Sequence, residues 1–199
     1  MAEDATVALV STANVKTFLG ITGSTEDTII DALVNSMSVA IAKYCGRDFV
    51  SAAATEYYDG TDAPSLVLKR YPIITLTSLN IDGARLFGSS TDVDVSANVI
   101  VDNNSGIITL WNLYDKFPCG RRNVKVVYTA GYATIPADLQ HAAKLAVQFT
   151  YKRHYTEQRI GIVSESVGDK NISYDQGDLP SPVKKLLAPY RKAGTSFVH

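Results

Sequence analysis

The sequence has little of what usually marks an enzyme, a metalloprotein or a membrane protein. Its two cysteines, Cys45 and Cys119, have neither a Cys-x-x-Cys spacing nor a paired histidine, which excludes a disulfide framework and a zinc motif. No apolar run approaches the ~20 residues that span a bilayer. The start, Met-Ala-Glu-Asp, lacks the basic and apolar regions of a signal peptide. We therefore expect a protein that folds in a reducing cytoplasm and has no membrane partner.

Motifs for catalysis are equally scarce. There is no glycine-rich phosphate loop and no Gly-x-Ser-x-Gly turn for a serine nucleophile. Asp138 with His141, and His154 with Glu157, each have the i,i+3 spacing that suits acid–base chemistry or metal ligation. On one helix, however, the two histidines point about 140° apart at about 100° per residue. The sequence therefore predicts no catalytic residue, no cofactor and no metal site.

What is present is the composition of an ordinary folded chain. Its 199 residues are 46% hydrophobic and 20% charged. A chain of this length can bury a hydrophobic core without help from disulfides or metal ions. The net charge of −1 provides no global attraction to nucleic acid. Charge is nevertheless unevenly distributed, because residues 1–100 carry 6 Lys/Arg and 12 Asp/Glu, whereas residues 101–199 carry 13 and 8. This asymmetry either attracts a neighbouring copy head to tail or is solvated surface.

The hydrophobic pattern predicts helices at both ends of the chain and strands between them. Helical spacing of apolar residues marks a first helix that ends before Gly20, a second from the cap Ser24 to Gly46, and a third that begins at Pro136 and reaches about Lys152. A short helix follows Pro180. The fold class that we expect is α+β: a small bundle core of about four helices, with an antiparallel β insertion between the second and third long helices. The corresponding domains are 1–52 (N-terminal helices), 53–130 (β-rich insertion) and 131–199 (helix, extended arm and short last helix).

Short β-branched and aromatic segments separated by turn residues fill the region 53–130. The dipeptide Asp82-Gly83 is a strong hairpin signal, because both residues tolerate positive φ. The predicted strands are Thr55–Tyr58, Ser65–Leu68, Ile73–Ile81, Arg85–Phe87, Val93–Val95, Val99–Val101, Ile107–Leu110 and Val124–Tyr128.

Three stretches together resemble the head–tail connector (adaptor) family of tailed bacteriophages. The first is Val126-Val127-Tyr128-Thr129-Ala130-Gly131-Tyr132 followed by Ile135-Pro136-Ala137-Asp138-Leu139. The second is Gly161-Ile162-Val163-Ser164-Glu165-Ser166-Val167-Gly168 with Ser173-Tyr174 after it. The third runs from Leu179-Pro180 to Leu187-Ala188-Pro189-Tyr190-Arg191. Their order and spacing are similar to those of the family over most of the chain. The shorter members of that family are mainly helical, and this chain differs from them in its β insertion.

The resemblance implies a structural virion protein rather than an enzyme. Such subunits form a ring, typically of twelve copies, beneath the portal protein at the head–tail junction, after assembly in the bacterial cytoplasm. They bind the portal, neighbouring copies and a stopper or tail-completion protein. DNA passes through the lumen without sequence-specific contact.

The contacts implied by the resemblance lie in the arm 158–179 and the last helix. We expect the interface residues to be Ile162, Glu165, Tyr174, Lys184, Lys185, Leu187, Tyr190 and Arg191. Deletion of residues 180–199 is expected to leave a folded subunit that does not join portal-containing heads. Two other functions remain open on the residues alone: a tail-completion or decoration protein of the virion, and a small ligand-binding α+β domain.

Overall fold

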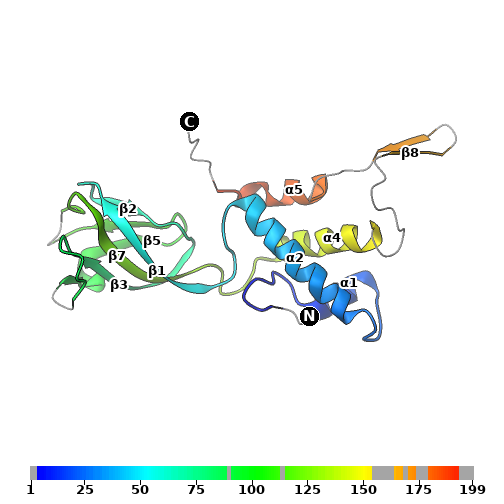
Figure 1. Cartoon of the computed structure of the whole chain (residues 1–199), viewed down its shortest axis with the longest axis horizontal. Coiled ribbons are helices and arrows are strands. Elements are labelled where there is room, and N and C mark those ends of the chain that lie inside the picture. The colour runs from blue at the N-terminus through cyan, green and yellow to red at the C-terminus, as the bar shows by residue number, and fades with distance from the viewer. Residues whose placement is uncertain are drawn as a thin grey trace. The chain divides into compact units, whose positions relative to one another are not determined.

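The computed structural model describes residues 4–88, 91–112, 115–153, 164–167, 170–173 and 179–192. The chain divides into two compact units (Figure 1). One, the helical unit, combines Met1–Phe49 with Thr134–His199, and the other, the β unit, is Val50–Ala133. The sequence-based boundaries were 52/53 and 130/131. Strands are thus inserted between two helical segments of the chain, as the sequence predicted.

The helical unit is built on two long helices that pack against each other. Its elements are α1 (Thr12–Leu19), α2 (Asp27–Cys45), α4 (Ala137–Tyr151), α5 (Ser181–Leu187) and the 3-10 turn η3 (Ala188–Tyr190). The Ser11 hydroxyl accepts the Asn14 N–H and begins α1, whereas Gly46 ends α2 in a left-handed conformation. The small buried side chains Ala142, Ala143 and Ala146 let α4 approach α2 closely.

The expected four-helix bundle core is not what forms. A bundle requires four helices long enough to share a continuous seam. Here α1 has 8 residues and α5 has 7, against 19 in α2 and 15 in α4. The β unit, moreover, has a hydrophobic core of its own. The chain is therefore an α+β protein with two cores rather than a bundle that carries a peripheral insertion.

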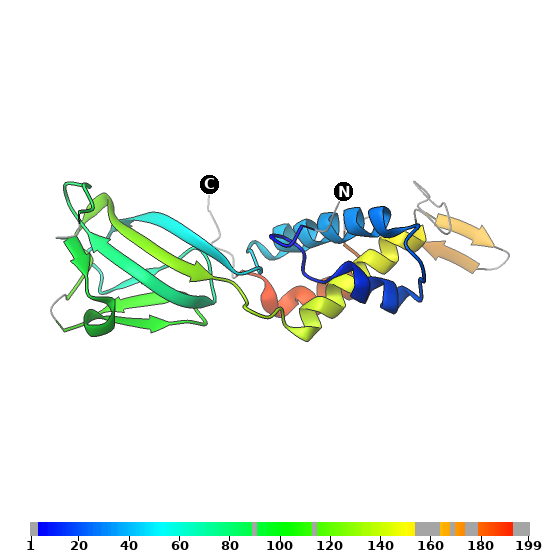
Figure 2. The same cartoon turned by 90° about the horizontal axis from the view of Figure 1, so that it is seen from below.

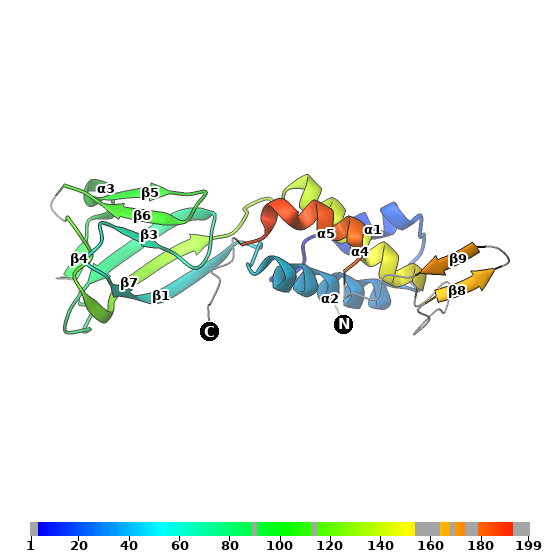
Figure 3. The ribbon, with the colours of Figure 1, turned by 90° about the horizontal axis from the view of Figure 1, so that it is seen from above.

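The β unit consists of two antiparallel sheets that enclose one core (Figures 2 and 3). The main sheet has the order β1-β7-β3-β4 and the small sheet the order β2-β6-β5. Inward side chains alternate with outward ones along β1, β5 and β6. The strands are β1 (Ala52–Gly60), β2 (Ser65–Val67), β3 (Ile73–Ile81), β4 (Asp92–Val93), β5 (Val99–Asp102), β6 (Ile107–Leu110) and β7 (Gly120–Ala130).

Two predicted strands of this region are wrong. Arg85–Phe87 is a loop, because the Asp82 carboxylate accepts the backbone N–H groups of Ala84, Leu86 and Phe87. The predicted strand Val93–Val95 shortens to β4 and is followed by the helical turn α3 (Val95–Asn98). Asp94 caps this turn by accepting the N–H groups of Ser96 and Ala97. Local side-chain hydrogen bonds thus overrode β propensity at both places.

A partly buried carboxylate joins the two sheets. Glu56 Oε2 accepts hydrogen bonds from the hydroxyls of Tyr58 and Tyr128, the latter at 2.8 Å. The backbone N–H groups of Lys69 and Arg70 donate to these two hydroxyls at 2.8 and 3.3 Å. Burial and the bond to Glu56 raise the pKa of both phenols, that of Tyr128 to about 12. The network fixes the segment between β2 and β3 against β1 and β7.

A separate two-stranded hairpin lies between α4 and α5 in the chain. Its strands are β8 (Ser164–Val167) and β9 (Lys170–Ser173), which pair antiparallel with Glu165 opposite Ile172. This hairpin belongs to the stretch that the sequence identified as an extended arm.

Candidate assembly surfaces

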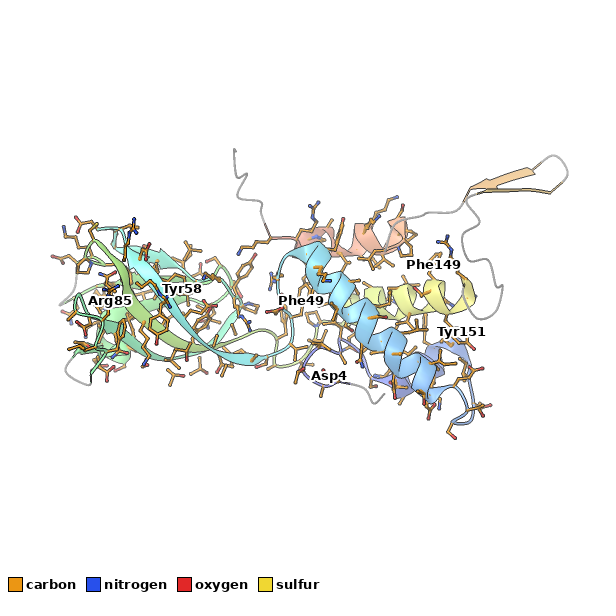
Figure 4. The ribbon with its side chains drawn as sticks, in the orientation of Figure 1. Asp4, Phe49, Tyr58, Arg85, Phe149 and Tyr151 are labelled. Atoms are coloured by element: carbon orange, nitrogen blue, oxygen red, sulfur yellow. The ribbon has the colours of Figure 1, made fainter. Side chains whose placement is uncertain are left out.

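The segment 188–192, which follows α5, contacts the C-terminal end of α2 and the first turn of α4. The Tyr190 hydroxyl donates to the Asp138 carboxylate at 2.6 Å, and its ring meets Phe49 edge-on, with the ring centroids 6.0 Å apart. Figure 4 labels Phe49 just beyond the end of α2. The Arg191 guanidinium lies 5.2 Å over the Tyr44 ring, and the Lys192 N–H donates to the Cys45 carbonyl at 2.8 Å.

The predicted contact residues of this segment therefore divide into two groups. Lys185 and Arg191 are exposed, and Lys184 and Tyr190 are half-buried. Leu187, in contrast, is fully buried in the helical unit. It is a core residue, so its prediction as a contact residue is not compatible with a subunit folded in this way. Leucine at this position satisfied the helical periodicity of a core face, which is the signal that should have excluded it.

The same burial corrects the expected effect of truncation. Deletion of residues 180–199 removes Val183 and Leu187, both of which are fully buried. Removal of one buried leucine side chain costs about 2–5 kcal/mol. The truncated chain is thus expected to lose stability in the helical unit, and a failure to assemble would not isolate a contact.

Four cations gather on α5 and the residues after it. Lys184, Lys185, Arg191 and Lys192 have no carboxylate oxygen within 4.0 Å among the described residues. The nearby Asp138 is engaged by the Tyr190 hydroxyl. This end of the helical unit therefore presents positive charge that is not neutralised within the subunit.

Of the predicted arm residues, only Glu165 lies within the described part of the chain. It stands in β8, opposite Ile172. Ile162 and Tyr174 lie outside the described residues.

Figure 4 labels two aromatic side chains near the C-terminal end of α4. Phe149 is exposed, and the Tyr151 hydroxyl donates to Glu26 at 2.6 Å.

The β unit carries apolar surface that the sequence did not reveal. Among the described residues the four most exposed large hydrophobic side chains are Leu86 (84%), Val67 (63%), Trp111 (56%) and Ile100 (55%). All four belong to the β unit. Strand periodicity indicates that one face is covered, but it does not tell which apolar residues remain uncovered after the two sheets pack.

Among the described residues we find no cluster of side chains arranged for metal binding. No three His, Cys, Asp or Glu side chains of this part of the chain are placed to hold a metal ion. The His141 ring stands edge-on to Phe18 at 6.0 Å, and His154 lies outside the described part. None of the described helices combines the length and the apolar character needed to cross a membrane.

Comparisons with known proteins agree with a role in assembly. A family model described as head completion protein matches residues 8–193. No curated protein matches the chain in sequence. The chain is similar to one in the neck of an empty gene transfer agent particle computed with C6 symmetry, with a TM-score of 0.61 and 19% identity over 98% of this chain and 94% of that chain. It is also similar to one in the neck of a native particle computed with C12 symmetry (TM-score 0.60, 16% identity, 98% and 93% coverage). A third similar chain comes from the virion of the native particle (TM-score 0.59, 19% identity, 98% and 94% coverage). At these identities the structures show a shared fold.

Proposed function

Because the chain belongs to the head completion protein family, we propose that it forms a ring beneath the portal protein and links the DNA-filled head to the tail or stopper protein. Membership confirms the sequence-based prediction of a structural virion protein rather than an enzyme. The family match over residues 8–193 carries this proposal, because it includes both units and leaves only short ends outside.

The similar structures support a ring in particular. They come from particle necks computed with C6 and C12 symmetry, and the likeness covers nearly the whole of each chain. Twelve copies related by rotation give a closed ring in which each subunit offers one surface to the copy before it and another to the copy after it. DNA passes through the central opening without sequence-specific contact.

Two elements of the helical unit are proposed to make the external contacts. Lys184, Lys185 and Arg191 meet an acidic surface of the portal, since their charge is not neutralised within the subunit. The hairpin of β8 and β9, with Glu165 in β8, contacts a neighbouring copy together with Ile162 and Tyr174. A two-stranded hairpin is marginally stable on its own, which favours a role completed by assembly.

A charge reversal on α5 tests the portal contact. Lys184→Glu combined with Lys185→Glu replaces two positive charges with two negative ones while Val183 and Leu187 stay in place. We expect the folded variant not to be incorporated into portal-containing heads. The matched control, Lys184→Arg with Lys185→Arg, keeps the charge and should be incorporated normally. Equal incorporation of both variants, measured by electron microscopy of purified heads, would refute the contact.

The ring is tested separately from the portal contact. Negative-stain electron microscopy of the purified protein, alone and bound to portal-containing heads, should show closed rings with a central opening. Particles that contain the protein without any ring at the packaging vertex would instead favour a decoration protein.

A further inference from the structure

The two outer faces of the β unit differ in chemistry. The main sheet and the small sheet share one core, so their outward sides lie on opposite faces of the unit. Leu86 projects from the loop that follows β3, beside the outer face of the main sheet. Val67 and Ile100 belong to the small sheet, and Trp111 directly follows its strand β6. A group of exposed apolar side chains on one face of a small unit, such as that of the small sheet, is typical of contact with another molecule.

The loop 82–88, named here the Leu86 loop, is held in one conformation. Asp82 accepts the N–H groups of Ala84 and Leu86 at 2.8 Å and that of Phe87 at 2.9 Å. Arg85 and Phe87 adopt φ values of 60° and 50°, which non-glycine residues rarely occupy. Figure 4 labels Arg85 in this loop. A strained loop with an exposed leucine is typical of a preorganised contact element.

Aromatic rings and cations surround the Leu86 loop on the main sheet. The Phe87 ring packs on Tyr57 at 5.4 Å between centroids. The Lys125 ammonium lies 6.0 Å from the Phe87 ring, and the Arg122 guanidinium lies 5.2 Å from the Tyr57 ring. Neither cation has a carboxylate oxygen within 4.0 Å among the described residues. This side of the β unit is therefore apolar at its tip and carries these two cations, together with the Asp59 carboxylate that accepts the Arg122 backbone N–H.

The outer face of the small sheet, named here the apolar face, carries one acidic residue and no cation at its outward strand positions. Val67 on β2 stands opposite Ile107 on β6, which in turn stands opposite Asp102 on β5. In the next outward row Ile100 lies across from Thr109. Trp111 continues the outward positions of β6, with its N–H bonded to the Asn98 carbonyl at 2.9 Å. Asp102 is the one charged residue among these outward positions, and it is acidic.

We propose that the Leu86 loop of one copy binds the apolar face of the next copy, so that the β units form part of the ring contact. The inference rests on the proposed ring. Three observations select a second copy as the occupant. The two surfaces lie on opposite faces of one unit, each is apolar, and the cations Arg122 and Lys125 on one face complement Asp102 on the other. A contact between two different surfaces of the same chain is what a closed ring requires.

Disulfide cross-linking tests the contact even when association is weak. In a Cys119→Ser background, which leaves only the buried Cys45, Leu86→Cys is combined with Ile100→Cys or with Val67→Cys. Because each copy then carries one cysteine on each contacting surface, oxidation should produce covalent chains of three or more copies. The matched single-cysteine variants should give at most dimers. Absence of chains longer than dimers from both double variants would overturn the proposal.

A mixing experiment tests the two-surface geometry. Leu86→Asp and Ile100→Asp each place a charge in the contact, and each should weaken self-association at least about tenfold. Leu86→Met, which stays apolar, should associate as the wild type does. Because each Asp variant keeps one intact surface, an equal mixture should form pairs of one copy of each, seen by light scattering coupled to size-exclusion chromatography. Failure of the mixture to pair would overturn the proposal.

The outcomes separate this inference from the proposed function. Rings that form as readily with Leu86→Asp and Ile100→Asp as with the wild type would refute the β-unit contact and leave the ring intact. A second result would also overturn the copy-to-copy contact. In that result Leu86→Asp copies cross-link to one another normally through other cysteine positions but do not join portal-containing heads. The Leu86 loop would then be assigned to a contact with another protein.

Discussion

Alkaline pH should destabilise the β unit through the phenols that share Glu56. Below pH 10 the Tyr128 phenol is protonated in both the folded and the unfolded chain, so its contribution to stability is fully present. Between pH 10.0 and about 12 the unfolded chain releases a proton that the folded protein retains, so the free energy of unfolding falls. At about 1.4 kcal/mol for each pH unit, Tyr128 alone accounts for a loss of about 3 kcal/mol. Tyr58 adds to the loss in the same direction.

The chain provides a separate probe for each unit. Trp111 is the only tryptophan and lies in the β unit, whereas circular dichroism at 222 nm reports mainly the helical unit. Urea unfolding followed by Trp111 fluorescence should show a midpoint that falls from pH 10 to pH 12. Tyr128→Phe should lower the midpoint at pH 7, because Glu56 and the Arg70 N–H each lose a partner, and should flatten the alkaline decline. A variant that declines as steeply as the wild type would refute the assignment to Tyr128.

Three further predictions concern single positions. Leu187→Ala should lower the free energy of unfolding of the helical unit by about 2–5 kcal/mol, measured at 222 nm, whereas the exposed control Lys185→Ala should change it by less than about 0.5 kcal/mol. Gly131→Ala should destabilise the β unit, because Gly131 has φ +116° and an added Cβ would lie 2.6 Å from the Val50 carbonyl oxygen; an unchanged Trp111 unfolding curve would contradict this. Asp82→Ala should accelerate amide hydrogen exchange in the loop that follows, since three N–H groups lose their acceptor, with exchange elsewhere in the β unit as the control.

The elements that the sequence predicted best are those whose ends are set by local chemistry. The left-handed Gly46 ended α2, and β3 has the predicted bounds Ile73–Ile81. Arg85–Phe87 failed because one aspartate, Asp82, gathered the N–H groups that a strand would have paired with a neighbour. Such a capture depends on the position of a single side chain, and a propensity pattern does not record it.

The predicted contact surface required information that only packing supplies. Lys185 and Arg191, which the sequence predicted as contact residues, are exposed, because charged side chains are rarely buried. Leu187 was misassigned, since a helix of two turns shows apolar periodicity without showing which neighbour covers it. The exposure of Leu86 and Ile100 follows from the pairing of strands distant in sequence, so no local pattern predicts it.

The order of the units along the chain has a consequence for folding. The β unit is one continuous segment, Val50–Ala133, whereas the helical unit is made of two segments that flank it. Closure of a flexible loop of this length costs roughly 4 kcal/mol in chain entropy. Folding of the β unit removes most of that cost, because Ala52 pairs with Ala130 and Val50 forms a bridge with Tyr132. The strands are thus expected to fold first during synthesis and to bring together the ends from which α2 and α4 then dock.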